Sequence, residues 1–272
     1  QLEVVLEVAQ RIDGQHIVYV SSQLDTPNPT YSATTSSISA SWPAITNAAS
    51  YKVYYKLSTA SSYSSDTVSA TSSPSWTKTS LTSGDVYSVY VQAIGSGNYA
   101  DSANSTATNV TVKTKLAAPS GLAVARYTNK LVLTWSAVAN KSSYLVYYKT
   151  GSGSYASKSA STESFELNNL GEGVTYSFYV VAKGTGNYVD SDASSTITGT
   201  TKETLSTPTG LAASDVLSTT ATLSWNAVTN ATSYKLTISD TNGPITGYDA
   251  KSISGTSESL TGLTSLDRKS VV

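Results

Sequence analysis

The sequence predicts an all-β protein organised as a tandem array of β-sandwiches. Apolar and polar residues alternate in short stretches, which is the pattern of strands that bury one face. Matching stretches recur about every ninety residues, which indicates repeated structural units. No apolar stripe with a helical period runs through the 272 residues. These three observations fix the fold class, and each element follows from them.

The most regular feature is a tryptophan that is followed nine residues later by a tyrosine. The pattern occurs three times in matching contexts, at Trp42 and Tyr51, Trp135 and Tyr144, and Trp225 and Tyr234. Large aromatic side chains bury much apolar surface, so we expect each pair to fill the centre of a small core. The repeated spacing is therefore interpreted as structural, and not as a carbohydrate-binding feature.

The predicted strands come in equivalent pairs along the chain. Residues 38–42 and 131–135 each present an apolar face and a mostly polar face, and residues 87–91 and 176–180 repeat this alternation later in each unit. Roughly seven short strands in about ninety residues are typical of a sandwich of two sheets.

A leucine followed three residues later by proline precedes each tryptophan, at Leu24, Leu116 and Leu205. Proline lacks an N–H and stiffens the chain, which suits a short linker or a sheet edge. The junctions divide the chain into four predicted parts. These are an N-terminal β-hairpin (1–23), a first domain (24–115), a second domain (116–204) and an incomplete third domain (205–272).

The units resemble fibronectin type III domains, which are immunoglobulin-like sandwiches. That family carries a tryptophan on the second strand, a tyrosine on the third, and a leucine six residues before a tyrosine at the start of the sixth. Leu81 precedes Tyr87, and Leu170 precedes Tyr176, at that spacing. The resemblance covers residues 24–204 well and 205–272 in part. The sulfur-free form, with its Gly-Asn-Tyr loops, is similar to repeats of bacterial surface proteins.

The two ends of the chain depart from the repeat. Lys269 stands where the third unit is expected to have its tyrosine, so this unit lacks most of its sixth strand and its seventh. Residues 1–23 form a predicted hairpin whose apolar positions are strand-donor candidates: Val4, Leu6, Val8, Val18 and Val20. Two explanations remain open. The chain is a window of a longer array, or the hairpin of one copy completes the open sandwich of the next.

The composition points away from several functional classes. Charged residues make up 13% of the chain and the net charge is −1, which gives no field to attract nucleic acid. No apolar run approaches the length of about twenty residues that spans a membrane. The chain has neither Cys nor Met, so it forms no disulfide or thiolate site and resists oxidation at sulfur. This composition suits an extracellular or cell-surface protein.

The sequence offers no catalytic, cofactor or metal site. His16 is the only histidine, and a single imidazole without cysteine supports neither a catalytic triad nor the usual zinc sites. We expect it to be an ordinary strand residue. The stretch from Asp240 to Gly243 resembles part of a calcium loop but lacks the other carboxylates, and Asn242-Gly243 is better interpreted as a hairpin turn.

Several tyrosines are candidates for ligand or interdomain contacts. Tyr99 and Tyr188 lie in repeated Gly-Asn-Tyr loops between the last two strands of each unit, where adhesive members of the family can carry a recognition sequence. Tyr55 and Tyr148 each belong to a pair of adjacent tyrosines, of which one is expected to be exposed. Structural packing is the favoured explanation for Tyr99 and Tyr188, and ordinary cross-strand pairing explains Tyr55 and Tyr148 as well as ligand contact does. Asn-x-Ser/Thr sequences occur at Asn104, Asn109, Asn140 and Asn230.

These features together predict a non-enzymatic extracellular protein, a semi-rigid stalk or filament component with a structural or adhesive role. Its partners would be neighbouring repeats or other copies of itself, and a cell-surface protein or glycan. The alternative is a ligand- or glycan-binding accessory module of a secreted adhesin or polysaccharide-degrading enzyme.

Overall fold

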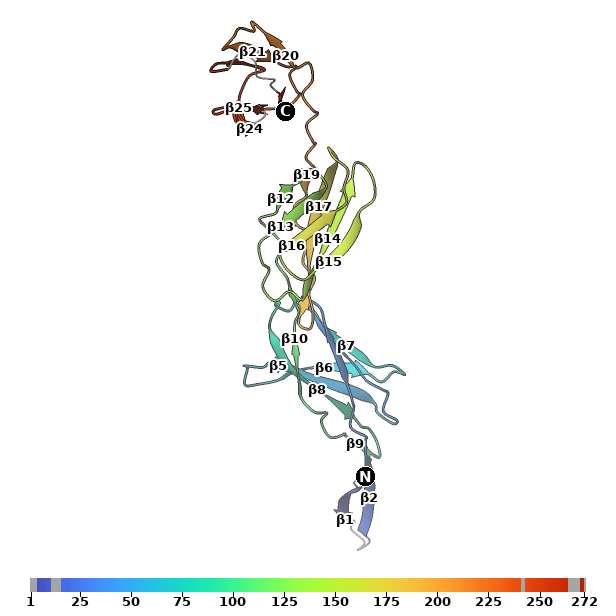
Figure 1. The fold of residues 1–272 in the computed structure, drawn as a ribbon. Coiled ribbons are helices and arrows are strands. Elements are labelled where there is room, and N and C mark those ends of the chain that lie inside the picture. The colour runs from blue at the N-terminus through green and yellow to red at the C-terminus, as the bar shows by residue number, and fades with distance from the viewer. Residues whose placement is uncertain (1–3, 11–15, 241–242, 264–269, 272) are drawn as a thin grey trace. The chain divides into compact units, whose positions relative to one another are not determined.

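The computed structural model describes residues 4–10, 16–240, 243–263 and 270–271, and every regular element among them is a β-strand (Figure 1). The predicted tandem of β-sandwiches is confirmed. The chain forms two compact units. One holds the hairpin and the first two sandwiches, and the other holds the third sandwich with two loops of the second, at Tyr127–Asn129 and Asn169–Val174.

Domain 1 is a sandwich of two antiparallel sheets. One sheet has the order β3-β4-β7, with β3 (Thr30–Ala33), β4 (Ile38–Ser41) and β7 (Ser75–Lys78). The other has the order β10-β8-β5-β6, with β10 (Thr108–Thr111), β8 (Val86–Ile94), β5 (Ser50–Leu57) and β6 (Ser64–Ser69). The apolar side chains at alternate positions of both sheets face each other and form the core.

Domain 2 repeats this arrangement strand for strand. Its first sheet has the order β12-β13-β16, with β12 (Ala123–Arg126), β13 (Lys130–Thr134) and β16 (Ser164–Asn168). Its second has the order β15-β14-β17-β19, with β15 (Ala156–Ala160), β14 (Ser143–Thr150), β17 (Thr175–Lys183) and β19 (Ile197–Thr200). The cross-strand register is also repeated, because Tyr148 lies opposite Phe178 where domain 1 has Tyr55 opposite Val89.

Domain 3 keeps the first sheet and builds the second from shorter pieces. The first sheet is β20 (Ala212–Ser214), β21 (Ala221–Ser224) and β26 (Ser257–Leu260). The pieces are β22 (Tyr234–Leu236) with β25 (Lys251–Ile253), and β24 (Gly243–Pro244), β23 (Ile238–Asp240) and β27 (Ser270–Val271). Val271 of β27 lies opposite Ile238, which stands where domains 1 and 2 have Tyr55 and Tyr148. Those tyrosines lie opposite Val89 of β8 and Phe178 of β17, so β27 pairs in the same register as these strands.

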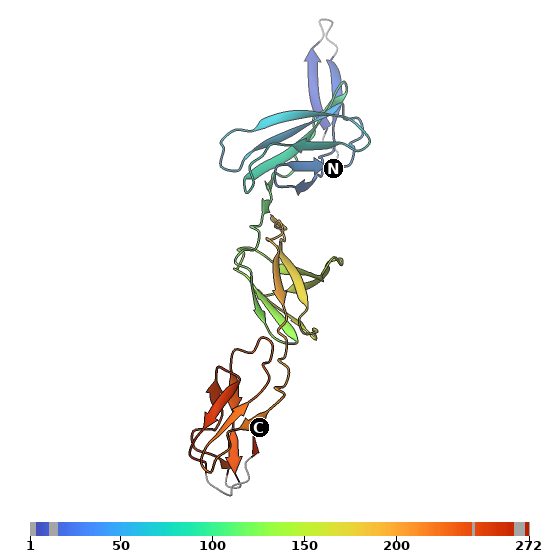
Figure 2. The same cartoon turned by 90° about the horizontal axis from the view of Figure 1, so that it is seen from above.

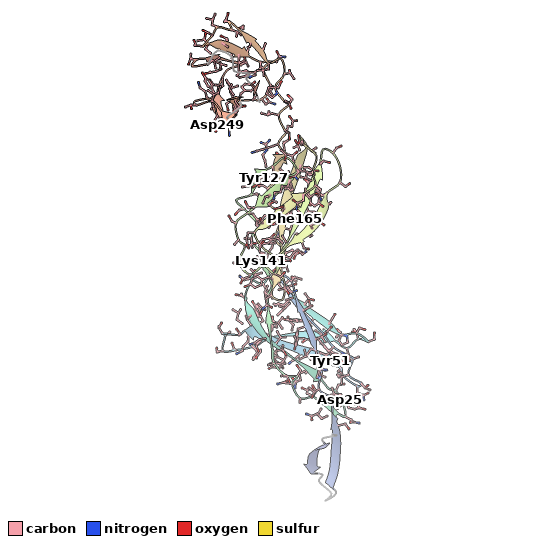
Figure 3. All side chains as sticks on the ribbon, viewed as in Figure 1. Asp25, Tyr51, Tyr127, Lys141, Phe165 and Asp249 are labelled. Carbon is pink, nitrogen blue, oxygen red and sulfur yellow. The ribbon has the colours of Figure 1, made fainter. Side chains whose placement is uncertain are left out.

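The predicted tryptophan–tyrosine pairs are in contact in all three domains, and in domains 1 and 2 both rings of the pair are buried in the core. The rings meet edge to face with centroids 5.3 Å apart for Trp42 and Tyr51, and 5.1 Å apart for Trp135 and Tyr144; Tyr51 is labelled within domain 1 in Figure 3. Each tyrosine hydroxyl also accepts a hydrogen bond from a backbone amide six residues earlier, as in Val138 N to Tyr144 Oη at 2.9 Å. The tyrosine therefore fixes the loop that follows the tryptophan in the sequence.

The predicted N-terminal hairpin is present. Strands β1 (Val4–Gln10) and β2 (His16–Gln23) pair antiparallel over their length, as the blue ribbon shows in Figure 2. Strand β2 then pairs in parallel with β9 (Tyr99–Ala100) of domain 1. A matching parallel pair joins β11 (Thr114–Lys115) to β18 (Tyr188–Val189) of domain 2.

Candidate functional site

The Gly-Asn-Tyr loops bind the segment that enters their own domain. In domain 1, the Ser22 amide donates to the Asn98 carbonyl at 3.0 Å, and the Leu24 amide donates to the Ala100 carbonyl at 3.1 Å. In domain 2, the Thr114 amide donates to Asn187 at 2.8 Å, and the Leu116 amide donates to Val189 at 3.1 Å. We call this repeated pairing of an entering segment with residues 98–100 or 187–189 the linker clip.

Glycine is required at the base of each clip loop because another part of the backbone lies against it. A Cβ at Gly184 would lie 2.5 Å from the Tyr188 carbonyl oxygen, and one at Gly95 would lie 2.2 Å from that of Tyr99. The loop is closed by an aspartate, since Asp190 accepts the Gly184 amide at 2.9 Å. Its side chain also pairs with Lys183, and this hydrogen bond together with the Gly184 amide lowers the pKa of Asp190.

Buried serines hold the segment that follows each loop. Ser191 and Ser194 are buried, and their hydroxyl oxygens accept the backbone amides of Ala182 and Val180 at 2.8 and 3.0 Å. Ser102 and Ser105 do the same for strand β8 in domain 1. The side chains thus take the place of a neighbouring strand and satisfy amides of β8 and β17 that would otherwise be unpaired.

The linker between domains 1 and 2 is hydrogen-bonded at both of its ends. Val112 is buried in the core of domain 1, and Leu116 is 5% exposed at the edge of domain 2. Between them, the Lys113 amide donates to Thr34 at 2.8 Å and its carbonyl accepts from Ser83 Oγ at 2.9 Å. The next residue, Thr114, already belongs to the clip of domain 2. No residue of this linker is left free of both domains.

The following linker is fastened at its first end by a different set of contacts. Thr201 is buried, and the Thr204 amide and hydroxyl donate to the Glu172 carboxylate at 2.8 and 2.6 Å. These hydrogen bonds lower the pKa of Glu172. Leu205, at the place of Leu24 and Leu116, is 48% exposed.

Domain 3 carries an apolar groove close to its tryptophan. The groove has a volume of about 390 Å³, and its lining includes Pro208, Leu211, Trp225 and Leu236. Trp225 is half-buried there, whereas Trp42 and Trp135 are buried. In domains 1 and 2, the clip loop is bonded to the backbone of Leu24 and Leu116, which stand at the place of Leu205.

A second repeated feature is a group of three tyrosines on the outer face of the second sheet. In domain 1, Tyr54 stacks on Tyr90 with ring centroids 4.7 Å apart, and Tyr63 meets Tyr90 edge to face at 4.9 Å. In domain 2, the stacked pair is Tyr147 and Tyr179 at 4.5 Å, and Tyr155 takes the place of Tyr63 at 4.8 Å. We call each group a tyrosine trio.

Each trio is bordered by a lysine, and its central tyrosine resists ionisation. The Lys56 Nζ lies 4.9 Å from the centre of the Tyr63 ring, and Lys149 lies 4.8 Å from that of Tyr155. Burial, followed by the neighbouring phenols, raises the pKa of Tyr90 and of Tyr179. Domain 3 has Thr237 at the place of Tyr54 and Tyr147, so this face differs there.

The structure places the predicted contact residues in different environments. Tyr99 is 37% exposed and Tyr188 is half-buried, and both belong to the clips. Tyr55 and Tyr148 do not lie on the outer face. Tyr55 packs against the core of domain 1 and receives a hydrogen bond from Lys78 at 2.6 Å. Its neighbour Tyr54 occupies the outward position, because successive side chains of a strand point to opposite faces.

Two groups of site residues were missed by the sequence analysis. Tyr90 and Tyr179 occupy outward positions in strands β8 and β17, and their alternation with buried valine and phenylalanine was the available signal. The buried serines follow Asp101 and Asp190 in a repeated Asp-Ser-x-x-Ser pattern, which is visible in the sequence. Its meaning depended on knowing which strand lies beside it.

The structure assigns none of the remaining predicted residues to these sites. The side chains of His16 and the strand-donor candidates Val4, Leu6, Val8, Val18 and Val20 lie outside those that the structure describes. Asp240 pairs with Gly243 in a hairpin, and Asn242 lies outside the described residues. All four Asn-x-Ser/Thr asparagines are exposed: Asn104, Asn109, Asn140 and Asn230.

Within the described residues, no three His, Cys, Asp or Glu side chains gather closely enough to hold a metal ion. No helix in that part of the chain is long and apolar enough to cross a membrane.

Comparison with known proteins identifies the fold family of domain 2. Residues 117–198 match the family model described as the fibronectin type III domain. Domain 1 shares its strand order, register and core pairs, so the chain contains tandem domains of this type. No curated protein matches the chain. A crystal structure of the FN1–FN3 domains of chicken CNTN1 is 16% identical with a TM-score of 0.44, covering 91% of this chain and 92% of that one.

Proposed function

We propose that this tandem array of fibronectin type III domains is a non-enzymatic extracellular spacer, a semi-rigid stalk or filament component. The observation that carries the proposal is the linker between domains 1 and 2. Only three residues separate the buried side chains of Val112 and Leu116: Lys113 is hydrogen-bonded to domain 1, and Thr114 and Lys115 pair with β18 of domain 2.

Such a linker restricts bending because motion at the joint must break backbone hydrogen bonds. A flexible linker needs several residues that are free to rotate, as in Gly/Ser-rich segments. Here the Lys113 amide and carbonyl bond to Thr34 and Ser83, and the amides of Thr114 and Leu116 bond to the clip loop. Domains 1 and 2 are therefore expected to be held apart at a restricted set of angles.

An extracellular location is part of the proposal. The surface is covered by hydroxyl side chains in place of charges, with 13% charged residues, and the chain contains no Cys or Met to be oxidised. The partners we propose are neighbouring repeats and other copies of the chain.

The shape of the particle in solution tests this function. Small-angle X-ray scattering of the 272-residue chain is expected to give an elongated particle. The matched control carries Gly-Gly-Ser inserted between Lys113 and Thr114. Because this flexible insertion loosens the joint, the maximum particle dimension from its scattering curve is expected to be less well defined. A compact globule for the unaltered chain would contradict the proposal.

Head-to-tail assembly by strand complementation is the finer form of this proposal. It is supported by the groove of domain 3, where Leu211 and Trp225 line an apolar surface that a β-hairpin of a second copy would cover. Deleting residues 1–23 is expected to abolish concentration-dependent association in analytical ultracentrifugation. A truncated chain that still associates, or a full chain that stays monomeric, would rule out this form.

A binding module is the second candidate function. It is favoured by the exposed ring of Tyr99, which directly follows the turn of a clip loop. Aromatic rings of this kind can stack on sugars or pack on proteins. A glycan array with the whole chain tests it, with Tyr99→Ala as the perturbing variant and Leu57→Ala, also exposed, as the control. Specific binding lost only in Tyr99→Ala would favour the module, and no binding would remove it.

A further inference from the structure

The tyrosine trios place phenol rings in contact across neighbouring strands. Tyr54 lies directly opposite Tyr90 in the β5–β8 register, and Tyr147 lies directly opposite Tyr179 in the β14–β17 register. Their ring planes are nearly parallel, at 16° and 13°, with centroids 4.7 and 4.5 Å apart. All four side chains lie on the outer face of a sheet and are partly open to solvent.

The same chain has no sulfur to intercept an oxidant. Cys and Met are absent from all 272 residues, and Tyr is abundant at 19. Thiols and thioethers are usually the first side chains to react with oxidants. One-electron oxidation of this protein must therefore fall mainly on its tyrosines and tryptophans, and the core tryptophans Trp42 and Trp135 are buried.

We propose that the trios are oxidative cross-linking sites, at which Tyr54 couples to Tyr90 and Tyr147 couples to Tyr179 to form dityrosine. The result would be a covalent staple between neighbouring strands of a chain that cannot form disulfides. The proposal concerns the chemistry of this face and stands independently of the stalk function.

The coupling consumes two equivalents of a one-electron oxidant, such as a peroxidase intermediate or a photogenerated metal complex. Each phenol loses one electron to the oxidant and one proton to water, which leaves two tyrosyl radicals. A carbon–carbon bond forms between the ring carbons next to the two hydroxyl-bearing carbons. The hydrogen on each bonded carbon is lost as a proton while each oxygen regains one, so both phenols are restored.

Contact between the rings decides which tyrosines couple. Two radicals held side by side react without having to diffuse together, which gives a large advantage over coupling between molecules. Tyr90 and Tyr179 each touch both other members of their trio, so each is the centre of its group. Domain 3 supplies an internal comparison, because Thr237 stands at the place of Tyr54 and Tyr147.

The experiment oxidises the full chain in dilute solution with ruthenium(III) tris-bipyridyl, generated by light and persulfate. The readouts are the blue fluorescence of dityrosine and tandem mass spectrometry of cross-linked peptides. Links from Tyr54 to Tyr90 and from Tyr147 to Tyr179 are expected to dominate. The double variant Tyr90→Phe, Tyr179→Phe keeps the packing of the rings and is expected to lower the yield of intramolecular dityrosine about tenfold. Tyr99→Phe, outside the trios, is the matched control and is expected to leave the yield unchanged.

Two results would overturn the proposal. One is an intramolecular yield that is the same in the double variant and in the unaltered chain. The other is dityrosine found only between molecules, rising with protein concentration, with the trio residues unmodified. Circular dichroism of the variants before oxidation confirms that a lost yield reflects chemistry and not unfolding.

Discussion

Two substitutions of Trp135 separate what the volume of its side chain contributes to the stability of domain 2 from what its N–H group contributes. The side chain is 6% exposed and meets Tyr144 edge to face at 5.1 Å. Its Nε1 has no hydrogen-bond acceptor among the described residues. The indole therefore fills the centre of domain 2 while carrying an unsatisfied buried donor.

The two substitutions are expected to differ strongly in cost. Trp135→Ala empties the centre of a small core and should lower the free energy of unfolding by about 3–5 kcal/mol. Trp135→Phe keeps an aromatic ring against Tyr144 and removes the unpaired N–H, whose burial costs about 1–3 kcal/mol. The loss of ring volume offsets that gain, so we expect a net change within about 1–2 kcal/mol for this variant.

Denaturant titration followed by hydrogen-exchange mass spectrometry measures the effect domain by domain. The protection of β14 and β17 is expected to fall sharply in Trp135→Ala and little in Trp135→Phe, while the strands of domain 1 keep theirs. Equal destabilisation by both variants would show that the indole N–H is satisfied or that the indole shape itself is needed. Unchanged stability in Trp135→Ala would show that the core of domain 2 is centred elsewhere.

Three further predictions concern the clip of domain 2. Gly184→Ala forces a Cβ to within 2.5 Å of the Tyr188 carbonyl, so amide exchange at Thr114 and Leu116 should accelerate, whereas Gly186→Asn, at φ +59° with nothing within 4 Å, should leave exchange unchanged. Ser194→Ala leaves the Val180 amide unpaired and should cost about 1–3 kcal/mol in denaturant unfolding, while exposed Ser195→Ala should be neutral. The folded-state pKa of Asp190 is lowered, so its stabilising contribution is present above its unfolded pKa and lost as pH falls through the folded one. Asp190→Asn should therefore flatten the acid end of the thermal stability profile, and an unchanged profile would show that this pairing contributes nothing.

The architecture could be predicted because it depends on local patterns. Alternation of apolar and polar residues fixes which face of each strand is buried, and the nine-residue spacing carries the chain from Trp135 on one sheet to Tyr144 on the other. The same spacing at Trp42 and Tyr51 gave the same contact. Because the units repeat, the pattern of one unit predicts the pattern of the next.

The clip and the trios were harder to foresee because they depend on pairings between distant segments. Nothing near Thr114 shows that it pairs with Asn187, and parallel pairing of two short strands leaves no alternation to detect. The sequence analysis names Tyr55, and not its neighbour Tyr54, as a contact candidate. Only the position of Tyr90 on the next strand shows which of the two faces outward with a partner.

Distance measurement across the first joint tests the central claim most directly. The chain has no Cys, so Thr67→Cys and Ser159→Cys, both exposed at equivalent places on β6 and β15, place spin labels in domains 1 and 2 without further changes. Double electron–electron resonance is expected to give a narrow distance distribution. The distribution should broaden when Gly-Gly-Ser is inserted between Lys113 and Thr114. An unaltered chain whose distribution is already as broad as that of the insertion variant would contradict a semi-rigid joint.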